Sequence, residues 1–308
     1  MSSWQHLEGT EIVVPGSIAN LGPGLDTLAV AVQLYLRIRI EGVSAHDRGA
    51  LEFSFDGHPL TVENRIETAF RMLVGDAEFP SMRLDVSSEI PMGAGLGSSA
   101  AATIAGFRLY EALLGQQSSE RLLTASTQLE GHADNVAACL LGGLAVCCQK
   151  SAGSVSAFSL PWPEALRFVV LTPAMTLATK KSRGALPESV PLKDAVANMQ
   201  RVLLMIQAIQ TGDDSVLLEA FCDRLHQPAR ELLVPGLKAA LGLSHPSLLG
   251  VFLSGSGPSI VAVARYGCDE IEELLAESYR PLGIPFRTSI LSVHTPAVTQ
   301  YSAMVSCS

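Results

Sequence analysis

Apolar and polar residues follow regular patterns along this chain, and these patterns predict its elements. Met82, Leu84 and Val86 alternate with polar residues, a period of two that predicts a strand. An apolar run over residues 100–114 predicts a helix with Ser98 or Ser99 near its N-cap and Gly115 just past its end. By similar patterns we expect strands at residues 10–16, 28–40, 51–55, 168–171, 247–253, 260–263 and 287–293, and helices at 64–74, 119–131, 192–210, 214–225 and 268–282.

A stretch containing Ser, Gly and Pro at residues 151–163 separates these elements into two groups. We interpret it as a linker and predict two domains, residues 1–158 and residues 159–308. The length of 308 residues suits one large or two ordinary domains, and 48% hydrophobic residues can form a sizeable core. Because strands and helices alternate in the second half, we expect a small α/β sandwich there.

A glycine-rich loop joins the strand near Val86 to the helix that follows. Gly93, Gly95 and Gly97 stand at alternate positions and allow a tight bend with φ values that other residues avoid. The order strand, glycine loop, helix gathers free backbone N–H groups and the positive end of the helix dipole at one point, which suits a phosphate. A tight turn without a ligand is the alternative interpretation, but the serine pair at residues 98–99 favours a phosphate and a metal.

This loop differs from the common nucleotide-binding motifs. It holds no Gly-Lys-Ser or Gly-Lys-Thr, and the first lysine of the chain is Lys150, so it is not a Walker loop. Its G-x-G-x-G spacing also differs from the dinucleotide fingerprint. Because the chain has no HRD or DFG triplet, a protein kinase of the common type is disfavoured too.

Charge and cysteine content narrow the partners and the compartment. A formal net charge of −9 disfavours nucleic acid or an anionic membrane surface as a partner. The longest apolar run, residues 136–148, is too short and too glycine-rich to span a membrane, and we see no signal peptide. The six cysteines lack C-x-x-C pairs and metal-ligand spacing, which indicates buried thiols in a reducing compartment and an exposed tail residue in the last case: Cys139, Cys147, Cys148, Cys222, Cys268 and Cys307. We therefore expect a soluble cytoplasmic protein.

Two loop-like segments hold charged or polar residues whose role the pattern leaves open. Residues 17–26 place Asn20 and Asp26 between apolar neighbours, and for this segment alone we favour a wide loop in which both side chains cap backbone groups. Residues 179–183 form the densest basic cluster of the chain, which is typical of a solvated loop.

A third polar segment surrounds His132. A lone histidine is more often structural than catalytic, but Glu130, Asp134 and Asn135 accompany this one beside an apolar helix. Such a gathering of polar groups favours a functional site over mere capping. A zinc site is disfavoured, because no second histidine stands four residues away.

Three stretches together resemble the GHMP superfamily of small-molecule kinases, named for galactokinase, homoserine kinase, mevalonate kinase and phosphomevalonate kinase. Residues 91–101 resemble its ATP loop, P-x-G-x-G-L-G-S-S-A, residues 15–26 its N-terminal substrate motif, and residues 254–259 its C-terminal glycine motif. Their order and spacing fit along nearly the whole chain. The resemblance implies an α+β fold of two domains, an N-terminal ATP-loop domain and a C-terminal ferredoxin-like α/β sandwich, with the active site in the cleft between them.

Within the superfamily the chain is most similar to the homoserine kinases. Residues 20–26 resemble their N-L-G-P-G-F-D, with Leu25 in place of phenylalanine, and residues 132–136 resemble their H-x-D-N-V. Arg183 and residues 227–230 fall where that family carries substrate arginines, whereas residues 15–18 depart from its usual P-A-T-S.

This similarity implies ATP-dependent phosphorylation of the side-chain hydroxyl of L-homoserine to O-phospho-L-homoserine, a step of threonine biosynthesis. A GHMP kinase for another small alcohol and a non-catalytic metabolite-binding protein of the same fold are the alternatives. A homodimer is implied as well, because the family is often dimeric.

The resemblance also implies roles for single residues. Ser99 and Glu130 would hold Mg²⁺, and Asn135 would orient the reactants, with no dedicated base. Homoserine would be bound by Asn20, Asp26, His132, Arg183 and Arg230; an acid suits its ammonium group, and arginine forks suit its carboxylate. ATP would contact Asn64, Pro91, Met92, Gly93, Ala94, Gly95, Leu96, Gly97, Ser98, Ser99, Ala100 and Ala101.

Overall fold

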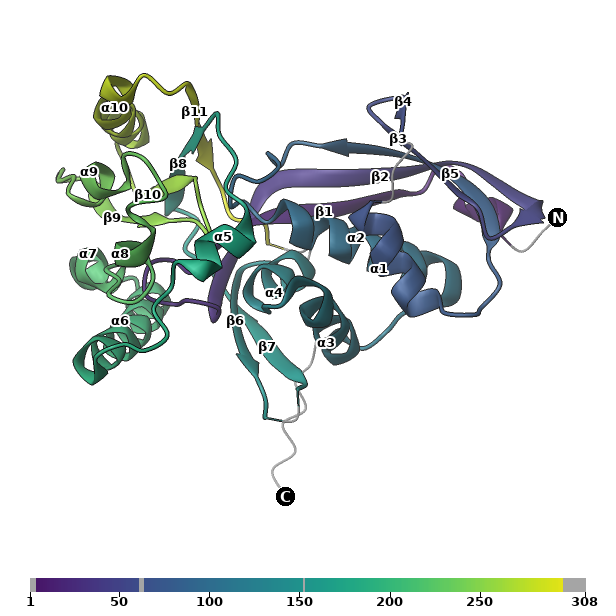
Figure 1. Ribbon diagram of the computed structural model, residues 1–308, viewed down its shortest axis with the longest axis horizontal. Coiled ribbons are helices and arrows are strands. Elements are labelled where there is room, and N and C mark those ends of the chain that lie inside the picture. The colour runs from purple at the N-terminus through teal and green to yellow at the C-terminus, as the bar shows by residue number, and fades with distance from the viewer. Residues whose placement is uncertain (1–3, 61–63, 152, 296–308) are drawn as a thin grey trace.

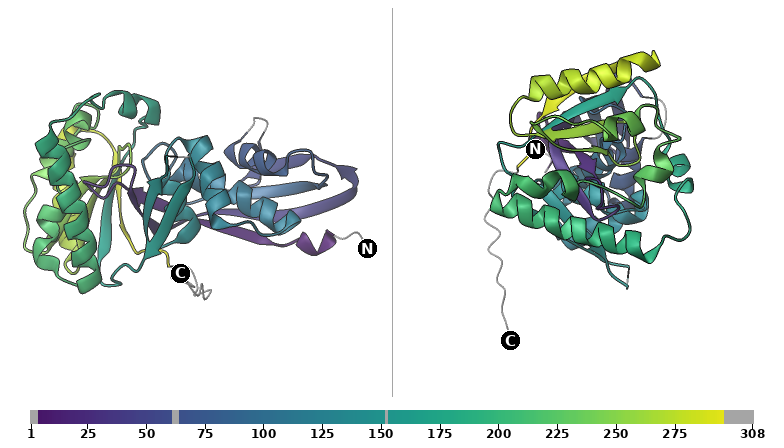
Figure 2. Two further views of the ribbon diagram at one scale, coloured as in Figure 1. Left: turned by 90° about the horizontal axis from the view of Figure 1, so that it is seen from below. Right: turned by 90° about the vertical axis from the view of Figure 1, so that its left-hand side faces the viewer.

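The computed structural model describes residues 4–60, 64–151 and 153–295, and it has an elongated shape (Figure 1). Elements of the first half of the chain lie at one end and those of the second half at the other (Figure 2). The two groups meet near the middle of the long axis, where the site described below lies.

The strands of the first half form one mixed sheet, seven-stranded within the described residues. Its order is β4 (His58–Pro59), β3 (Leu51–Phe55), β5 (Pro80–Ser88), β2 (Leu28–Arg48), β6 (Leu144–Gln149) and β7 (Val155–Leu160), and β1 (Glu11–Ala19) also pairs with β2. β3 runs parallel to β5, and β1 runs antiparallel to β2, with Glu11 opposite Arg39 and a register shift at Pro15/Gly16.

Helices α1 (Arg65–Val74), α2 (Ser98–Leu114), α3 (Ser119–Glu130) and α4 (Asp134–Leu141) pack against this sheet. α2 and α4 contact β1 and β2, and α1 packs on α2. Gly106 permits the close approach of α1, since a Cβ there would lie 2.3 Å from the carbonyl oxygen of Ile66. These contacts hold the N-termini of α2 and α4 at the end of β1 that faces the second half.

The second half forms a separate antiparallel sheet in the order β11 (Phe286–Leu291), β8 (Arg167–Pro173), β10 (Ile260–Ala264), β9 (Leu248–Leu253). Helices separate β8 from β9, and α10 (Cys268–Tyr279) separates β10 from β11, which gives the β-α-β-β-α-β order of a ferredoxin-like sandwich. The other elements are α5 (Thr179–Gly184), α6 (Leu192–Thr211), α7 (Leu217–Ala220), α8 (Gln227–Arg230), α9 (Leu237–Leu241) and the 3₁₀ turns η1 (Gln5–Leu7), η2 (Asp214–Val216) and η3 (Arg280–Leu282).

Alternation along β10 places apolar side chains on both faces of this second sheet. Val261 and Val263 join a core that continues into the first half, together with Phe221 beside α7. Ile260 and Ala262 belong to a second core beneath α9 and α10. One apolar core therefore links the two halves, and they meet on buried side chains.

The predicted helix ends are confirmed where glycine decides them. Gly115 and Gly131 follow α2 and α3 with φ values of 99° and 80°, which other residues rarely adopt. The prediction that Ser98 or Ser99 lies near the N-cap of α2 is confirmed. Gly97 occupies that position with φ 75°, and the serines are the first two helical residues.

Three local predictions are wrong for identifiable reasons. β7 occupies the middle of the expected linker at 151–163, where it pairs with β6, so the predicted division at 158/159 falls inside a strand. The expected helix at 214–225 is broken into η2 and α7, because the chain turns at Asp223, whose carboxylate accepts hydrogen bonds from the backbone N–H groups of Leu225, His226 and Gln227. The basic cluster at 179–183 forms the short helix α5 instead of a loop.

The cysteine prediction holds only in part. Cys139 and Cys147 are buried, whereas Cys148 and Cys222 are exposed, and Cys307 lies outside the described residues. No helix within the described ranges combines the length and apolar character needed to cross a membrane.

Candidate active site

A cleft lies where the two halves meet. Its walls come from the segment at residues 20–26, the glycine loop, residues 130–135, residues 177–183, and Arg230 with the 255–256 turn. The predicted site residues that line it are Asn20, Asp26, Gly93, Ala94, Gly95, Gly97, Ser98, Ser99, Ala100, Glu130, His132, Asn135, Arg183 and Arg230. The fold thus brings the predicted phosphate loop and all five predicted substrate residues to one cleft.

The glycine loop uses its carbonyl groups to bind the rest of the protein. Five successive carbonyl oxygens accept hydrogen bonds: Gly93 from Leu177 N (3.3 Å), Ala94 from Ser259 N (3.1 Å), Gly95 from Ser254 Oγ (2.6 Å), Leu96 from Ser17 N (3.1 Å) and Gly97 from Ala101 N (2.8 Å). The N–H groups in the first turn of α2 have no acceptor within the helix. Backbone donors and the helix dipole are therefore the groups that the loop offers to an anion in the cleft.

Gly95 brings the backbones of the two halves into contact. Its φ is 80°, and a Cβ there would lie 2.4 Å from the carbonyl oxygen of Ser254 and 2.8 Å from that of Gly257. Only glycine fits here, because other residues rarely adopt this φ and because any side chain would clash with the backbone of the 254–257 turn. The glycine at this position is therefore required for the docking of the C-terminal glycine turn, independently of any phosphate.

Five residues predicted to contact ATP lie outside the walls of this cleft. Met92 is 78% exposed, Ala101 is buried, and Pro91 and Leu96 line a neighbouring groove. Asn64 is the N-cap of α1, where its Oδ1 accepts a hydrogen bond from Glu67 N at 3.0 Å. Contacts of these five with ATP stay predictions.

Ser99 and Glu130 form the oxygen-rich corner of the cleft. The Ser99 hydroxyl donates to Glu130 Oε1 at 2.9 Å, and the Thr103 hydroxyl donates to the same oxygen at 2.7 Å. Arg65 Nε lies 3.5 Å from it. The sequence does not single out Thr103 or Arg65, because both contacts cross between helices and leave no pattern along the chain.

This corner fits Mg²⁺ by chemistry and by spacing. A hydroxyl and a carboxylate are hard oxygen ligands, which Mg²⁺ prefers. Adjacent ligands of an octahedral ion with bonds of about 2.0–2.1 Å lie roughly 2.8–3.0 Å apart. Ser99 Oγ and Glu130 Oε1, at 2.9 Å, have that spacing. Ser99 and Glu130 are thus suited to hold the ion on the phosphate side of the cleft.

Asp26 and Arg183, predicted to bind opposite charges of a substrate, bind each other. Arg183 Nη1 and Nη2 donate to Asp26 Oδ2 and Oδ1 at 3.0 and 2.5 Å, a bidentate pair between the first half and α5. The hydrogen bond to Asp26 is the main cause that raises the pKa of Arg183. Their side chains are 40% and 35% exposed, so both remain accessible from the cleft.

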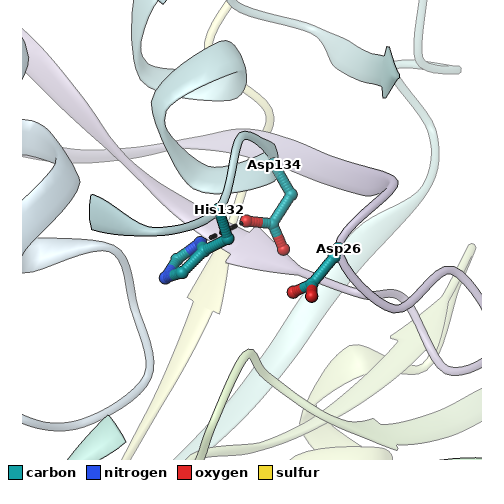
Figure 3. A group of neighbouring side chains, drawn as sticks. All are labelled: Asp26, His132 and Asp134. Carbon is teal, nitrogen blue, oxygen red and sulfur yellow. Dashed lines mark hydrogen bonds and ion pairs between the residues drawn. The ribbon is translucent and has the colours of Figure 1, made fainter. Parts of the chain in front are cut away.

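His132, Asp134 and Asn135 form a buried hydrogen-bonded group at the N-terminus of α4. Asp134 Oδ1 lies 2.7 Å from His132 Nδ1 (Figure 3). The same oxygen accepts from Asn135 N at 2.7 Å. Burial alone would lower the pKa of His132, but its hydrogen bond and charge interaction with Asp134 outweigh burial and raise the pKa. Asn135 Oδ1 accepts from the Ser17 hydroxyl at 2.8 Å, which fixes the orientation of its amide.

Asp134 is a site residue to which the sequence interpretation assigned no role. It is 2% exposed, lines the cleft, and its carboxylate points toward Asp26 (Figure 3). Ligand atoms of Asp26, His132 and Asp134 lie within 4.8 Å of one another. Two carboxylates so placed make this corner suitable for a cation, and an ammonium group meets that requirement without a metal.

Arg230, like Asp134, is a deeply buried charge of the cleft, at 2% exposure. Its Nη1 donates to Gly255 O at 3.0 Å and to His226 Nδ1 at 2.9 Å, and its Nε has no hydrogen-bond partner among the described residues. Burial, followed by the positive charge of Arg183, lowers its pKa. A carboxylate in the cleft would supply the missing negative charge.

The comparisons with known proteins identify the family and the fold of this chain. The sequence profile of the GHMP kinases N terminal domain matches residues 64–143. The chain is 39% identical to the homoserine kinase of Solibacter usitatus, over 91% of each chain, and 37% identical to a homoserine kinase of Thermus thermophilus, over 92% of this chain and 95% of the relative.

Solved structures show the same fold. A homoserine kinase from Cytophaga hutchinsonii superposes with a TM-score of 0.79 at 26% identity, covering 92% of this chain and 94% of the other. A mevalonate kinase superposes with a TM-score of 0.65 at 13% identity, covering 93% and 99%, which supports the fold alone. The predicted α+β GHMP kinase fold is confirmed, and the chain belongs to the homoserine kinase family.

Proposed function

We propose that this chain transfers the γ-phosphoryl group of ATP to the side-chain hydroxyl of L-homoserine, giving O-phospho-L-homoserine and ADP for threonine biosynthesis. The observation that carries the proposal is the meeting, in one cleft, of an anion-binding loop with the oppositely charged pair Asp26 and Arg183. The loop suits phosphates, and the two opposite charges, once their pair opens, suit the ammonium and carboxylate groups of an amino acid.

On the phosphate side, the chain supplies positioning and neutralisation. The N–H groups of the loop and of the first turn of α2 bind phosphate oxygens, and Ser99 with Glu130 holds Mg²⁺. When bound, Mg²⁺ neutralises charge that develops on the transferring phosphoryl group. With no Walker lysine in the loop, the backbone N–H groups and the helix dipole are what the chain itself contributes to this neutralisation.

On the acceptor side, the pair Asp26–Arg183 opens to receive the two charges of the substrate. Asp26, with Asp134 behind it, accepts from the ammonium group, and Arg183 and Arg230 donate to the carboxylate. Asn20 fixes the position of Asp26 relative to the turn at Gly255, because its Oδ1 accepts from Asp26 N at 3.2 Å and its Nδ2 donates to Gly255 O at 3.0 Å.

Phosphoryl transfer demands alignment more than a strong base. Asn135 is 8% exposed and its amide is fixed by Ser17 and Asp134, so it orients the hydroxyl without removing its proton. Asp134 holds the ring of His132 through Nδ1 and raises its pKa, so His132 contributes a positioned polar group to the acceptor side of the cleft.

Two alternatives share the fold. A GHMP kinase for another small alcohol would use the same loop, and a metabolite-binding protein would lack the metal ligands; the presence of Ser99 and Glu130 disfavours the second. A coupled assay of ADP release with homoserine, threonine, mevalonate and shikimate decides among them. Turnover with homoserine alone supports the proposal; turnover with another alcohol, or with none, contradicts it.

We further propose a cytoplasmic homodimer. The outer face of α6 supports self-association, since Leu192, Val196, Met199 and Leu203 form an apolar stripe that is 36–78% exposed. Unpaired cysteines among the described residues agree with a reducing compartment. Light scattering on the parent chain and on Leu203→Lys tests the dimer. A parent dimer that becomes a monomer in the variant supports the proposal, and a monomeric parent chain contradicts it.

A further inference from the structure

The segment at residues 20–26, which we call the substrate loop, has an unfavourable backbone conformation. Asn20, Leu21 and Asp26 have φ values of 70°, 47° and 55°, a region that residues other than glycine rarely adopt. Such conformations persist only where surrounding structure holds them. The contacts that hold this loop therefore bear on the placement of Asn20 and Asp26 in the cleft.

Two buried side chains of the second half hold two successive carbonyl groups of the substrate loop. His226 Nε2 lies 2.7 Å from Gly22 O, and Asn198 Nδ2 donates to Pro23 O at 3.1 Å. The loop and the chain before α8 are in tight contact here, since a Cβ on Gly22 would lie 1.9 Å from Phe221 O. His226 and Asn198 are 0% and 3% exposed, and neither lines the cleft.

The chemistry of Arg230 determines the tautomer of His226. A guanidinium group only donates hydrogen bonds, so His226 Nδ1, 2.9 Å from Arg230 Nη1, must be the acceptor. Nε2 then carries the proton and donates to Gly22 O. One neutral imidazole thereby joins the loop that carries Asp26 to the arginine on the opposite side of the substrate.

The hydrogen bonds around His226 pair it with Gly22 O and Arg230 and not with Asp223. Asp223, its nearest acid, lies 3.8 Å from Nε2, and its oxygens already accept from three backbone N–H groups and from Asn198 Nδ2 at 2.6 Å. Without His226, Arg230 would keep only its hydrogen bond to Gly255 O, since its Nε is already without a partner in the described part of the chain.

We propose that His226 is a positioning residue, supported by Asn198, that sets the distance between the ammonium-binding and carboxylate-binding sides of the cleft. This proposal rests on the proposed function for the identity of the substrate. It predicts a loss confined to the alcohol: the KM for homoserine rises roughly tenfold in His226→Leu, the KM for ATP stays within about twofold, and kcat falls less than kcat/KM.

Two conservative variants separate the two hydrogen bonds of His226. Glutamine places an amide near Nε2 and keeps the bond to Gly22 O, whereas asparagine places one near Nδ1 and keeps an acceptor for Arg230. Both variants should have a KM for homoserine between those of the parent chain and His226→Leu. Asn198→Leu, which removes the bond to Pro23 O, should raise the same KM and serves as the test if His226→Leu does not fold.

Arg201→Met is the matched control. Arg201 lies in α6 with Asn198, is 9% exposed and pairs with Glu219, away from the cleft, so its loss should lower stability without changing the KM for homoserine. Amide hydrogen exchange at residues 20–26 gives a readout without substrate: it should be faster in His226→Leu and unchanged in Arg201→Met.

Turnover by the parent chain alone tests the proposed function, because that chain phosphorylates either homoserine or another alcohol. The variants are then assayed with the alcohol that the parent chain uses, which tests the positioning role separately. Unchanged exchange at residues 20–26 in His226→Leu would overturn the positioning role. Equal increases in the KM for ATP and for the alcohol, or a Gln and an Asn variant no better than Leu, would overturn it too.

Discussion

Replacing Asp26 with asparagine should affect two ligands in opposite directions. In the free protein Asp26 and Arg183 neutralise each other, so any ligand that uses Arg183 must first separate the pair. Homoserine offers an ammonium group to Asp26 in return. 4-Hydroxybutanoate, which is homoserine without its amino group, offers nothing and leaves Asp26 unpaired.

The structure sets the size of each contribution. With side chains 35–40% exposed, solvent screening limits the pair to about 1 kcal/mol, the upper end for exposed pairs. A hydrogen bond between the substrate ammonium group and Asp26 contributes about 2 kcal/mol. Asp26→Asn removes both, so homoserine should bind about fivefold more weakly and 4-hydroxybutanoate about fivefold more tightly. The preference for homoserine should fall about 30-fold, because the cost of opening the pair cancels in the ratio.

The assay is kcat/KM and calorimetric Kd for both ligands at fixed ATP, in the parent chain and in Asp26→Asn. Arg183→Met is the reciprocal variant and should favour 3-amino-1-propanol, which lacks the carboxylate, in the same way. ATP affinity should be nearly unchanged in both variants. If Asp26→Asn weakens the two ligands equally, or weakens 4-hydroxybutanoate at all, the exchange of the internal pair for a zwitterion is refuted.

The remaining predictions concern the metal corner, the glycine loop, the buried histidine and the thiols. Glu130→Gln and Ser99→Ala should each lower kcat at least tenfold by removing an oxygen ligand of Mg²⁺, and near-parental turnover of Glu130→Gln at saturating Mg²⁺ would contradict the assignment. Gly95→Ala should lower the free energy of unfolding by about 1–3 kcal/mol as well as weaken ATP binding, because its Cβ would meet Ser254 O at 2.4 Å; an unchanged thermal midpoint would count against this contact. Burial lowers the pKa of His226 among the charges of Asp223, Arg230 and Asp26. The neutral side chain therefore stabilises the fold fully above the pKa of histidine in the unfolded chain, about 6.5, and this stabilisation is lost as the pH falls. Thermal midpoints measured between pH 5 and 7.5 should decline less steeply with falling pH in His226→Gln. Burial raises the pKa of Cys139 and Cys147 to about 12, so a disulfide reagent at pH 8 should leave both unmodified in the native protein, and their rapid reaction would disprove their burial.

The sequence alone predicted those features that depend on residues close together in the chain. Glycine after an apolar helix ends that helix, because only glycine adopts the required φ cheaply, and this holds at Gly115 and Gly131. The spacing of its glycines likewise predicted the glycine loop and its position before α2. The motif residues then indicated the family, which the relatives confirm.

Elements that depend on a neighbour could not be predicted from the sequence. β7 buries only Val155 among its six residues and exposes Phe158 at 56%, so its alternation is weak and its pairing with β6 makes it a strand. The helix expected at 214–225 yields to Asp223, whose carboxylate binds the N–H groups of the next turn.

Only the tertiary structure decided how the site residues pair. The sequence marks Asp26 and Arg183 as separate ligands of a substrate, yet they lie 157 positions apart and bind each other, and His226 reaches Gly22 across 204 positions. Local preferences carry no information on such contacts, because they form only when the two halves dock on their shared core and the cost of ordering distant side chains is met by burial. The sequence by itself therefore indicated which groups to expect in the cleft, and the docking of the two halves decided which of those groups hold one another in place.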